Sequence, residues 1–270
     1  MTPVLPIKSV VKPWGRDVLP APFEAGGQRI GEIWFEPPAL LPGLLIKYIF
    51  TSEALSVQVH PSDAQTLAGG LGKQGKEECW LVIDAEPGAV LGVGFDAPLD
   101  AKAMRAAALD GSIERLMTWH PVAAGDFFYI PAGTVHAIGA GVSLIEVQQN
   151  SDITYRLYDY GRPRELHLDD GITVASGAVY TDPRRCRLAE RGEEVLVDGP
   201  LFRFDRIDGP PSEALRLAYG DAPLLVVPRG IGVSVAGIDI AVGECAVARG
   251  IDEVAVSGGA LALLAMPVRS

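Results

Sequence analysis

The sequence predicts an all-β protein built from two successive barrels, with one short helical insertion. Polar and apolar residues alternate over short stretches such as residues 56–60, which is the period of a half-buried strand. The 31 glycines and 21 prolines separate these stretches at short intervals, as turns between strands require. Only residues 101–117 have the alanine and leucine content that is typical of a helix.

The predicted elements can be followed along the chain. Asp100 can cap the helical stretch, and Gly111 with Ser112 divides it into two short helices. In order, we expect strands over residues 34–59, a loop with one helical turn over 61–75, strands over 79–95, the two helices over 101–117, strands over 119–147 and a loop-rich connection over 161–183.

The strands predicted after residue 185 are apolar segments separated by glycines, as in the first part of the chain. No histidine follows His167, so they cannot provide histidine ligands. Residues 243–250 echo the glycine pattern of residues 125–133 in a form one residue shorter, with Ala248 in place of the proline. We therefore predict a first domain over residues 1–165, with the helical insertion at about 98–118, and a second barrel-like domain over residues 166–270. The second domain is expected to be structural and to cover exposed sheet edges.

Four side chains of the first part combine the ligand types and the spacing of a metal site. Gln58 and His60 are two residues apart in a predicted strand, so they project from the same face. Glu78 opens the next strand, and His136 follows a turn that contains proline and glycine. Nitrogen and oxygen ligands together suit a divalent transition ion, above all Zn²⁺. The sequence therefore predicts one metal site made of these four residues.

Each of these residues alone has an ordinary explanation. A Gln-x-His pair is commonly a polar strand face, a glutamate at the start of a strand is commonly solvated, and a single histidine can lie satisfied in a core. Their joint occurrence beside turn-forming residues favours the metal site. The remaining histidines, His120 and His167, lack such neighbours and are expected to be structural.

The motifs around these ligands resemble the type I mannose-6-phosphate isomerases of the cupin superfamily, in their short bacterial form. Gly125, Pro131, Gly133 and His136 have the spacing of the second cupin motif, and Gln58 stands where most cupins have a histidine. The segment Ser-Val-Gln-Val-His-Pro at residues 56–61 is similar to the corresponding strand of the isomerases. Further similar segments are Lys-Pro-Trp-Gly (12–15), Gly-Glu-Ile-Trp (31–34), Leu-Leu-Ile-Lys (44–47), Lys-Glu-Glu-Cys-Trp (76–80) and Asn-Ser-Asp-Ile-Thr-Tyr-Arg (150–156).

The resemblance implies two cupin (jelly-roll) barrels and a metal-dependent aldose–ketose isomerase. Such an enzyme would interconvert mannose 6-phosphate and fructose 6-phosphate through a cis-enediol, with one divalent ion per chain: Zn²⁺, or else Mn²⁺, Co²⁺ or Fe²⁺. The candidate bases for the proton transfer are Asp152 and Glu146, with His60 and Lys76 as candidate helpers in ring opening. Glu146 can equally be an inward-facing carboxylate paired with a lysine or an arginine.

A phosphosugar substrate requires a local cationic cluster, because the net charge of the chain is −11. Arg156, Arg162 and Arg164 lie within nine residues, and Lys76 precedes Glu78 by two. Planar guanidinium groups suit phosphate oxygens. We expect Arg156 and Lys76 to act in both binding and catalysis, with Arg162 as a further phosphate ligand. For Arg164, a solvated position in a basic loop is the alternative.

Two other classes of protein fit the same fold. A cupin oxygenase normally needs Fe²⁺ and a histidine-rich triad, so Gln58 and the cationic cluster count against it. A non-catalytic sugar-binding cupin would have lost Asp152, Arg156 or a metal ligand, and none of these is lost. Measurement of oxygen uptake separates an oxygenase from an isomerase.

The remaining features concern partners and compartment. The net charge argues against nucleic acid as a partner, and no apolar stretch is long enough to cross a bilayer. No signal peptide is evident, and three widely spread cysteines fit a reducing cytoplasm, where we expect all three to be small buried hydrophobes. We therefore expect a cytoplasmic protein, and the resemblance implies a monomer.

Overall fold

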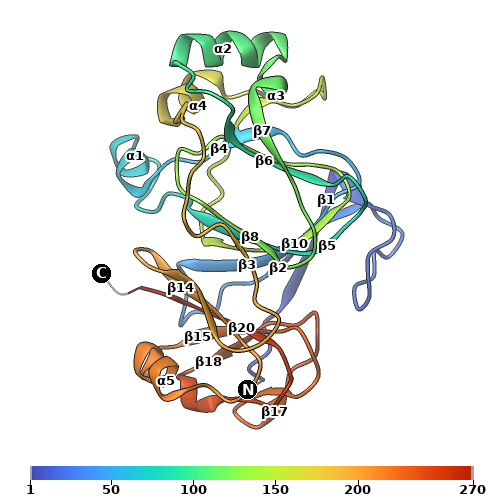
Figure 1. The fold of residues 1–270 in the computed structure, drawn as a ribbon, viewed down its shortest axis with the longest axis vertical. Coiled ribbons are helices and arrows are strands. Elements are labelled where there is room, and N and C mark those ends of the chain that lie inside the picture. The colour runs from blue at the N-terminus through green and yellow to red at the C-terminus, as the bar shows by residue number, and fades with distance from the viewer. Residues whose placement is uncertain (1, 269–270) are drawn as a thin grey trace.

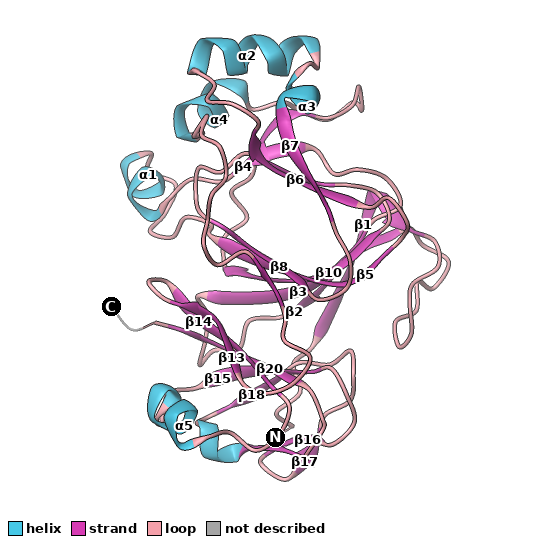
Figure 2. Ribbon diagram, in the orientation of Figure 1, coloured by secondary structure: helices cyan, strands magenta, loops and turns pink. Residues whose placement is uncertain are grey.

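A computed structural model describes residues 2–268, and its regular elements are mainly strands (Figure 2). Four antiparallel sheets follow one another along the longest axis of the molecule, and helices lie at both ends of the stack (Figure 1). The prediction of an all-β fold with a short helical insertion is confirmed.

The largest sheet lies in the middle of the molecule and has seven strands, in the order β1-β2-β3-β10-β5-β8-β12. Its non-consecutive neighbours show that the chain crosses between two facing sheets, as in a jelly roll. The strands of this sheet are β1 (Ile7–Arg16), β2 (Ile30–Phe35), β3 (Leu44–Phe50), β5 (Glu78–Ala85), β8 (Asp126–Ile130), β10 (Val142–Gln149) and β12 (Cys186–Arg187).

A five-stranded sheet faces the seven-stranded sheet on one side, in the order β11-β4-β9-β6-β7. Apolar side chains of both sheets, among them Trp80 and Leu91, form one buried cluster between them. The strands of this second sheet are β4 (Val57–Val59), β6 (Val90–Phe95), β7 (Met117–Pro121), β9 (His136–Ile138) and β11 (Tyr155–Tyr158).

Alternation along each strand decides which side chains of the seven-stranded sheet face this second sheet. In β3, Ile46 and Tyr48 point into the core on the opposite side, whereas Lys47 lies between the two sheets. In β5, Cys79 points away from the second sheet, and Glu78, the preceding residue, points toward it. Charged residues of otherwise apolar strands are thereby brought into the space between the sheets.

The helical insertion forms as the sequence predicts. Helix α2 (Ala101–Asp110) begins at Asp100, whose carboxylate accepts a hydrogen bond of 2.7 Å from the backbone nitrogen of Ala103. It ends at Gly111, where the φ of +79° favours glycine. Helix α3 (Ile113–Leu116) follows directly, and both helices pack on the outer face of the five-stranded sheet.

Helix α1 (Asp63–Ala68) is the single helical element expected between residues 61 and 75, and the hydroxyl of Ser62 caps it. Helix α4 (Leu168–Val174), in contrast, is not predicted from the sequence; it lies in the stretch expected to be a loop-rich connection, and the rest of residues 161–183 contains no other helix or named strand. The helix contains only a few apolar residues, and so short a pattern does not identify a helix from sequence. These residues pack beside α2. Both α4 and β12 follow residue 165 but pack on the first part, and the domain boundary remains a prediction.

The C-terminal part of the chain forms two smaller sheets with their own core. A five-stranded sheet has the order β13-β14-β20-β15-β18, and a three-stranded sheet has the order β17-β16-β19. The elements are β13 (Glu194–Asp198), β14 (Phe202–Ile207), α5 (Glu213–Tyr219), β15 (Leu224–Pro228), β16 (Val233–Val235), β17 (Ile238–Asp239), β18 (Ala246–Ala248), the 3₁₀ helix η1 (Ile251–Glu253), β19 (Val254–Val256) and β20 (Ala262–Pro267).

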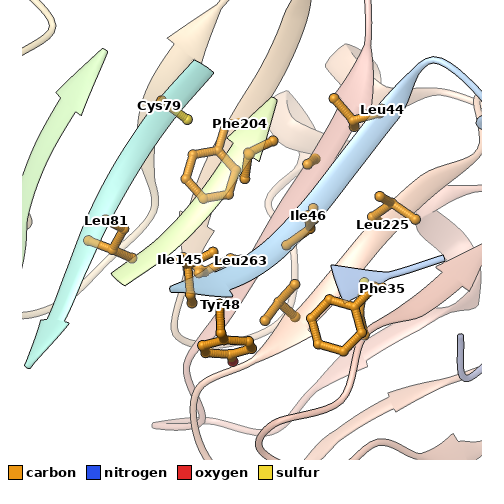
Figure 3. Packing of buried hydrophobic residues seen from close by; sticks show 14 of the residues in the cluster. Phe35, Leu44, Ile46, Tyr48, Cys79, Leu81, Ile145, Phe204, Leu225 and Leu263 are labelled. Atoms are coloured by element: carbon orange, nitrogen blue, oxygen red, sulfur yellow. The ribbon is translucent and has the colours of Figure 1, made fainter. Parts of the chain in front are cut away.

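The C-terminal five-stranded sheet covers a face of the seven-stranded sheet, not its edges as the sequence led us to expect. Phe204, Leu225 and Leu263 pack against Ile46 and Ile145 in one continuous core (Figure 3). Strand alternation explains the correction. The second apolar face of β3, β5, β8 and β10 needs a partner layer, and burial of a whole sheet face removes far more apolar surface from water than protection of one edge.

The first residues of the chain bind the C-terminal sheet before they enter the seven-stranded sheet. The backbone nitrogen of Leu5 donates to the carbonyl of Cys245 at 2.8 Å, and that of Val247 donates to the carbonyl of Pro3 at 2.9 Å. A β-bridge joins Val4 to Ala246. Strand β1 starts two residues after Leu5, so this segment links the two parts of the structure.

The similar glycine patterns of residues 125–133 and 243–250 begin with the same turn. Gly125 and Gly243 have φ of +93° and +92°. In each turn the next residue, Asp126 or Glu244, accepts a hydrogen bond of 2.8 Å from the backbone nitrogen three residues earlier. The repeat stops there, because Gly250 has an extended φ of −168°.

The three cysteines do not all behave as predicted. Cys79 and Cys245 are buried, whereas Cys186 is only partly buried because it lies on the edge strand β12. All three are unpaired within residues 2–268. In the same part of the chain, no helix combines the length and the apolar character needed to span a bilayer.

Candidate metal centre and active site

Three candidate metal ligands from separate strands meet between the two large sheets. One ligand atom from each of His60, Glu78 and His136 lies within 4.8 Å of the others, and all three residues are buried. The carboxylate oxygens of Glu78 are 3.5 Å from the Nε2 atoms of both histidines. His60 follows β4, Glu78 opens β5 and His136 opens β9, so the facing sheets bring together residues that are far apart in the sequence.

Backbone carbonyls orient both imidazole rings. The Nδ1 atom of His60 lies 2.9 Å from the carbonyl of Ile153, and the Nδ1 atom of His136 lies 2.9 Å from the carbonyl of Thr134. A carbonyl only accepts hydrogen bonds, so each Nδ1 must carry the proton. The Nε2 lone pairs of the two rings are therefore available to a cation, which is the usual arrangement of metal-binding histidines.

Gln58 lies beside His136 on the neighbouring strand. The two residues are register partners of β4 and β9, and the amide nitrogen of Gln58 is 3.3 Å from Nε2 of His136. Rotation of the amide by half a turn exchanges its nitrogen and oxygen, so that the oxygen would face the same point. The four residues predicted as metal ligands are thus close neighbours.

The carboxylate of Glu78 is fully buried, and its Oε1 has no hydrogen-bond partner within the described residues. Its charge is balanced by Lys76, whose Nζ atom lies 2.9 Å from Oε2 and 3.1 Å from Nε2 of His60. Burial alone would raise the pKa of Glu78, but Lys76 and His136 hold it below its ordinary value. Burial and then Lys76 lower the pKa of His60 well below its ordinary value. A buried anionic carboxylate beside two neutral imidazoles fits a divalent cation.

A pocket of about 310 Å³ opens beside this group of ligands. Gln58 and Lys76 form part of its wall, together with Asp152, Arg156 and Arg164. The pocket is therefore continuous with the candidate metal site and is lined by both signs of charge.

The interior wall of the pocket carries a row of charges, buried except for the partly buried Lys12, that sequence reasoning missed apart from Glu146. Lys12 lies 3.0 Å from Glu32, Lys47 lies 4.0 Å from Glu32, and Lys47 lies 2.8 Å from Glu146. Burial would lower the pKa of Lys47, but Glu146 and Glu32 raise it above its ordinary value. The signal in the sequence is a charged residue within a run of apolar ones, as in Leu-Leu-Ile-Lys-Tyr-Ile-Phe at residues 44–50.

The two carboxylates considered as catalytic bases occupy different environments. Glu146 is 3% exposed, pairs with Lys47 and accepts a hydrogen bond of 2.9 Å from Nε1 of Trp80. Asp152 is exposed, lines the pocket and has no ion-pair partner within residues 2–268. Asp152 is thus the more accessible of the two, and Glu146 matches the paired inward carboxylate considered as its alternative.

The three arginines differ in their access to the pocket. Arg156 lines it, and Nη1 of this arginine donates to the carbonyl of Glu165 at 2.7 Å. Arg164 also lines it, so the alternative of a solvated loop residue does not describe its position. Arg162 is outside the set of lining residues, and its donors are engaged by Asp159, Glu53 and the carbonyl of Ala54.

The two remaining histidines lie away from the metal group. His167 supports Arg156 through its backbone: Nδ1 of His167 accepts from the Arg156 nitrogen at 3.2 Å, and the His167 nitrogen donates to the Arg156 carbonyl at 2.8 Å. His120 packs its ring against Phe128 with a centroid distance of 5.5 Å.

Comparison with known proteins supports the resemblance found in the motifs. No protein-family model matches the chain. The mannose-6-phosphate isomerase of Streptococcus mutans is 42% identical over 167 residues, which are 59% of this chain and 52% of that protein. Mannose-6-phosphate isomerase ManA of Bacillus subtilis is 44% identical over 137 residues, which are 48% of this chain and 43% of that protein.

The chain is similar to mannose-6-phosphate isomerases. It spans about half the length of the curated relatives that it matches. Its fold is that of solved mannose 6-phosphate isomerases: the Bacillus subtilis structure has a TM-score of 0.79 at 23% identity and covers 97% of this chain and 98% of its own. A zinc-bound mannose 6-phosphate isomerase has a TM-score of 0.73 at 14% identity, with 98% of this chain and 99% of its own covered.

Proposed function

We propose that this protein is a metal-dependent isomerase that interconverts mannose 6-phosphate and fructose 6-phosphate through a cis-enediol. The observation that carries the proposal is the convergence of Gln58, His60, Glu78 and His136 beside a pocket whose wall includes the cation Arg156. The pocket thus combines a site for a divalent ion with a site for an anionic group.

We assign Gln58, His60, Glu78 and His136 as the ligands of one divalent ion. The neutral imidazoles and the buried carboxylate support Zn²⁺, as does the structural similarity to a zinc-bound isomerase, although Mn²⁺, Co²⁺ and Fe²⁺ accept the same donors. When bound there, the ion would polarise the carbonyl and the adjacent hydroxyl of the sugar.

Asp152 is the carboxylate that we propose for the proton transfer between C1 and C2. It is exposed in the pocket, whereas the charge of Glu146 is already committed to Lys47 and Trp80. A base must reach the carbon-bound proton directly or through one water, which favours the accessible group. We assign Glu146 to the support of Lys47, and Lys76 to contact with the sugar oxygens near Glu78.

Arg156 is the residue that we propose for the phosphate group. It is the register partner of Gln58 in β11 and β4, and Gln58 is the partner of His136 in β9. Two strand spacings of about 4.8 Å therefore separate Arg156 from His136 along the sheet. This separation suits a substrate whose reacting carbons and phosphate lie at opposite ends. Arg162 is a weaker candidate, because its donors are engaged elsewhere.

A coupled assay of the purified protein with mannose 6-phosphate tests the proposal. We expect isomerisation that a chelator abolishes and that added Zn²⁺ restores. Glu78→Gln should lower kcat/KM by at least about 100-fold together with the bound metal. Arg105→Ala, which removes one half of an exposed ion pair with Asp169, should change neither.

Two results would contradict this assignment. Isomerisation that persists in full after the metal has been removed would exclude the metal from the reaction. Oxygen consumption with a sugar or another small molecule, without isomerisation, would place the protein among the cupin oxygenases.

Asp152→Asn separates the candidate bases, because loss of a general base lowers kcat by about 10²–10⁴-fold. An unchanged kcat would assign the proton transfer to another group.

We further propose that the protein acts as a monomer in the cytoplasm. The unpaired cysteines support a reducing compartment, and the net charge of −11 disfavours nucleic acid as a partner. Light scattering coupled to gel filtration tests the monomer, and a mass of two chains or more would contradict it.

A further inference from the structure

Two arginines in the pocket wall have different electrostatic environments. Within residues 2–268 the guanidinium of Arg156 has no ion-pair partner, and its Nε atom is buried without a hydrogen bond. Arg164, in contrast, forms two hydrogen bonds of 2.6 Å with the carboxylate of Asp159, one from Nε and one from Nη2. One arginine thus lacks a counter-anion, while the other is held in a fixed direction.

Asp159 is placed to control the direction of Arg164. Its side chain is 2% exposed, and its two oxygens accept from Nε and Nη2 of Arg164 in the bidentate geometry that fixes a guanidinium plane. A guanidinium has five N–H donors, so three of those of Arg164 remain free. Because Arg164 lines the pocket, these donors are available to a ligand there.

We infer that Arg156 and Arg164 form a two-arginine clamp for the phosphate group, and that Asp159 is the positioning residue of this clamp. The inference rests on the proposed function, since the anion is taken to be the phosphate of the sugar. It assigns the second arm to Arg164 and excludes Arg162, although both arginines contact Asp159.

The charges around the clamp explain why it needs an anion. Burial and then the nearby Arg164 lower the pKa of Arg156, so the two cations repel each other in a partly dehydrated place. A single buried carboxylate, Asp159, serves both Arg162 and Arg164. A phosphate dianion would offset this positive charge, and two of its oxygens can accept from the two parallel donors of a planar guanidinium.

Arg162 illustrates the difference between a clamp residue and a structural neighbour. Its Nη1 atom donates to Asp159 at 3.1 Å, and its Nη2 atom donates to Glu53 at 3.1 Å and to the carbonyl of Ala54 at 2.8 Å. These contacts tie the loop after β11 to the segment before β4. They leave Arg162 turned toward protein acceptors, outside the pocket wall.

Inhibition of the metal-loaded enzyme by inorganic phosphate tests the clamp. In Arg164→Ala the inhibition constant and the KM for mannose 6-phosphate should each rise by about 10-fold to 100-fold, with a smaller change in kcat. Arg105→Ala, with the same loss of charge at an exposed site, is the control. An unchanged inhibition constant in Arg164→Ala, or a larger effect in Arg162→Ala, would overturn the clamp.

A double-mutant cycle tests the positioning role of Asp159. Asp159→Asn should weaken phosphate inhibition in the wild-type background and add little in the Arg164→Ala background, because it acts through that arginine. Equal losses in the two backgrounds would contradict the role. If Asp159→Asn fails to fold, Asp159→Glu takes its place in the cycle, because it keeps the negative charge but moves the carboxylate oxygens relative to Arg164.

The clamp and the proposed function fail in different ways. If the wild-type protein does not isomerise mannose 6-phosphate, the function is wrong, and calorimetry with inorganic phosphate still tests the two arginines. If the wild-type protein isomerises the sugar and Arg164→Ala retains its phosphate inhibition, the clamp is wrong and the function stands.

Discussion

Replacement of Lys47 by methionine is the perturbation whose effect on stability follows most directly from the structure. The Nζ atom lies 2.8 Å from Oε1 of Glu146, and the two side chains are 8% and 3% exposed. Removal of one partner of a buried ion pair typically costs about 3–5 kcal/mol, because the other charge is left unpaired. Here Trp80 still donates to Glu146, which lowers the expected cost toward the smaller figure.

The cost has an upper bound that depends on pH. A stranded carboxylate can take up a proton instead, which for an ordinary glutamic acid costs about 3.7 kcal/mol at pH 7 and about 1 kcal/mol at pH 5. We therefore expect Lys47→Met to lose about 3 kcal/mol of unfolding free energy at pH 7 and about 1 kcal/mol at pH 5. Urea denaturation of the variant and the wild-type protein at both pH values measures these differences.

The double variant Lys47→Met, Glu146→Gln is the matched control. Replacement of both partners of a buried pair is often neutral or stabilising, so the double variant should recover most of the lost stability. A loss at pH 7 below about 1 kcal/mol in Lys47→Met, or an equal loss at pH 5 and pH 7, would refute the reasoning. Either result would mean that the pocket wall is too hydrated for the pair to matter.

Three further predictions concern stability. Burial alone would raise the pKa of Glu32, but Lys47 and Lys12 outweigh it and hold the pKa below its ordinary value. The contribution of Glu32 to the unfolding free energy is therefore present above the unfolded pKa and is lost as pH falls through the folded pKa. Glu32→Gln should therefore show a shallower loss of unfolding free energy below about pH 4.5 than the wild type, and equal slopes in urea titrations would contradict this. Phe204→Ala should cost about 3–5 kcal/mol by removing a ring from the core between the seven-stranded sheet and the C-terminal five-stranded sheet, whereas Leu217→Ala at a 78% exposed position should stay within about 0.5 kcal/mol. If urea denaturation gave similar losses of unfolding free energy for Phe204→Ala and Leu217→Ala, the interface around Phe204 would be loosely packed. Asp100→Ala should cost about 1 kcal/mol through loss of the helix cap, and an unchanged melting temperature would argue against the cap.

Strand positions and the helical insertion followed from the sequence because their signals are local. Asp100 and Gly111 mark the ends of α2 through a cap and a left-handed turn, and both depend on immediate neighbours alone. Gln58 and His60 could be placed on one face because the side-chain period of a strand is two. Helix α4 escaped prediction because its apolar pattern is short and because its stability depends on packing beside α2.

The charges inside the pocket could not be predicted in the same way. Lys47 and Glu32 sit in apolar strands, and only the pairing of β2 with β3 and of β3 with β10 brings them to each other and to Glu146. Register of this kind is a property of the assembled sheet. The same holds for Asp159, whose contact with Arg164 is decided by the turn after β11. The position of the C-terminal five-stranded sheet could not be predicted either. Alternation predicts that the seven-stranded sheet has a second apolar face, but it does not predict which part of the chain packs on that face.

The crossing of Pro3–Leu5 onto Cys245–Val247 bears on how the molecule is made. Leu5 and Cys245 are 245 − 5 = 240 positions apart, yet they share a backbone hydrogen bond. During synthesis, residues 3–5 cannot dock until residues 245–247 have emerged from the ribosome. Until the C-terminal five-stranded sheet has formed, the apolar face of the seven-stranded sheet that it covers is exposed to water. Rapid folding of the C-terminal part, or a chaperone, would limit aggregation of nascent chains at this stage. The rate at which residues 196–265 are synthesised should therefore influence the yield of native protein more than pauses elsewhere.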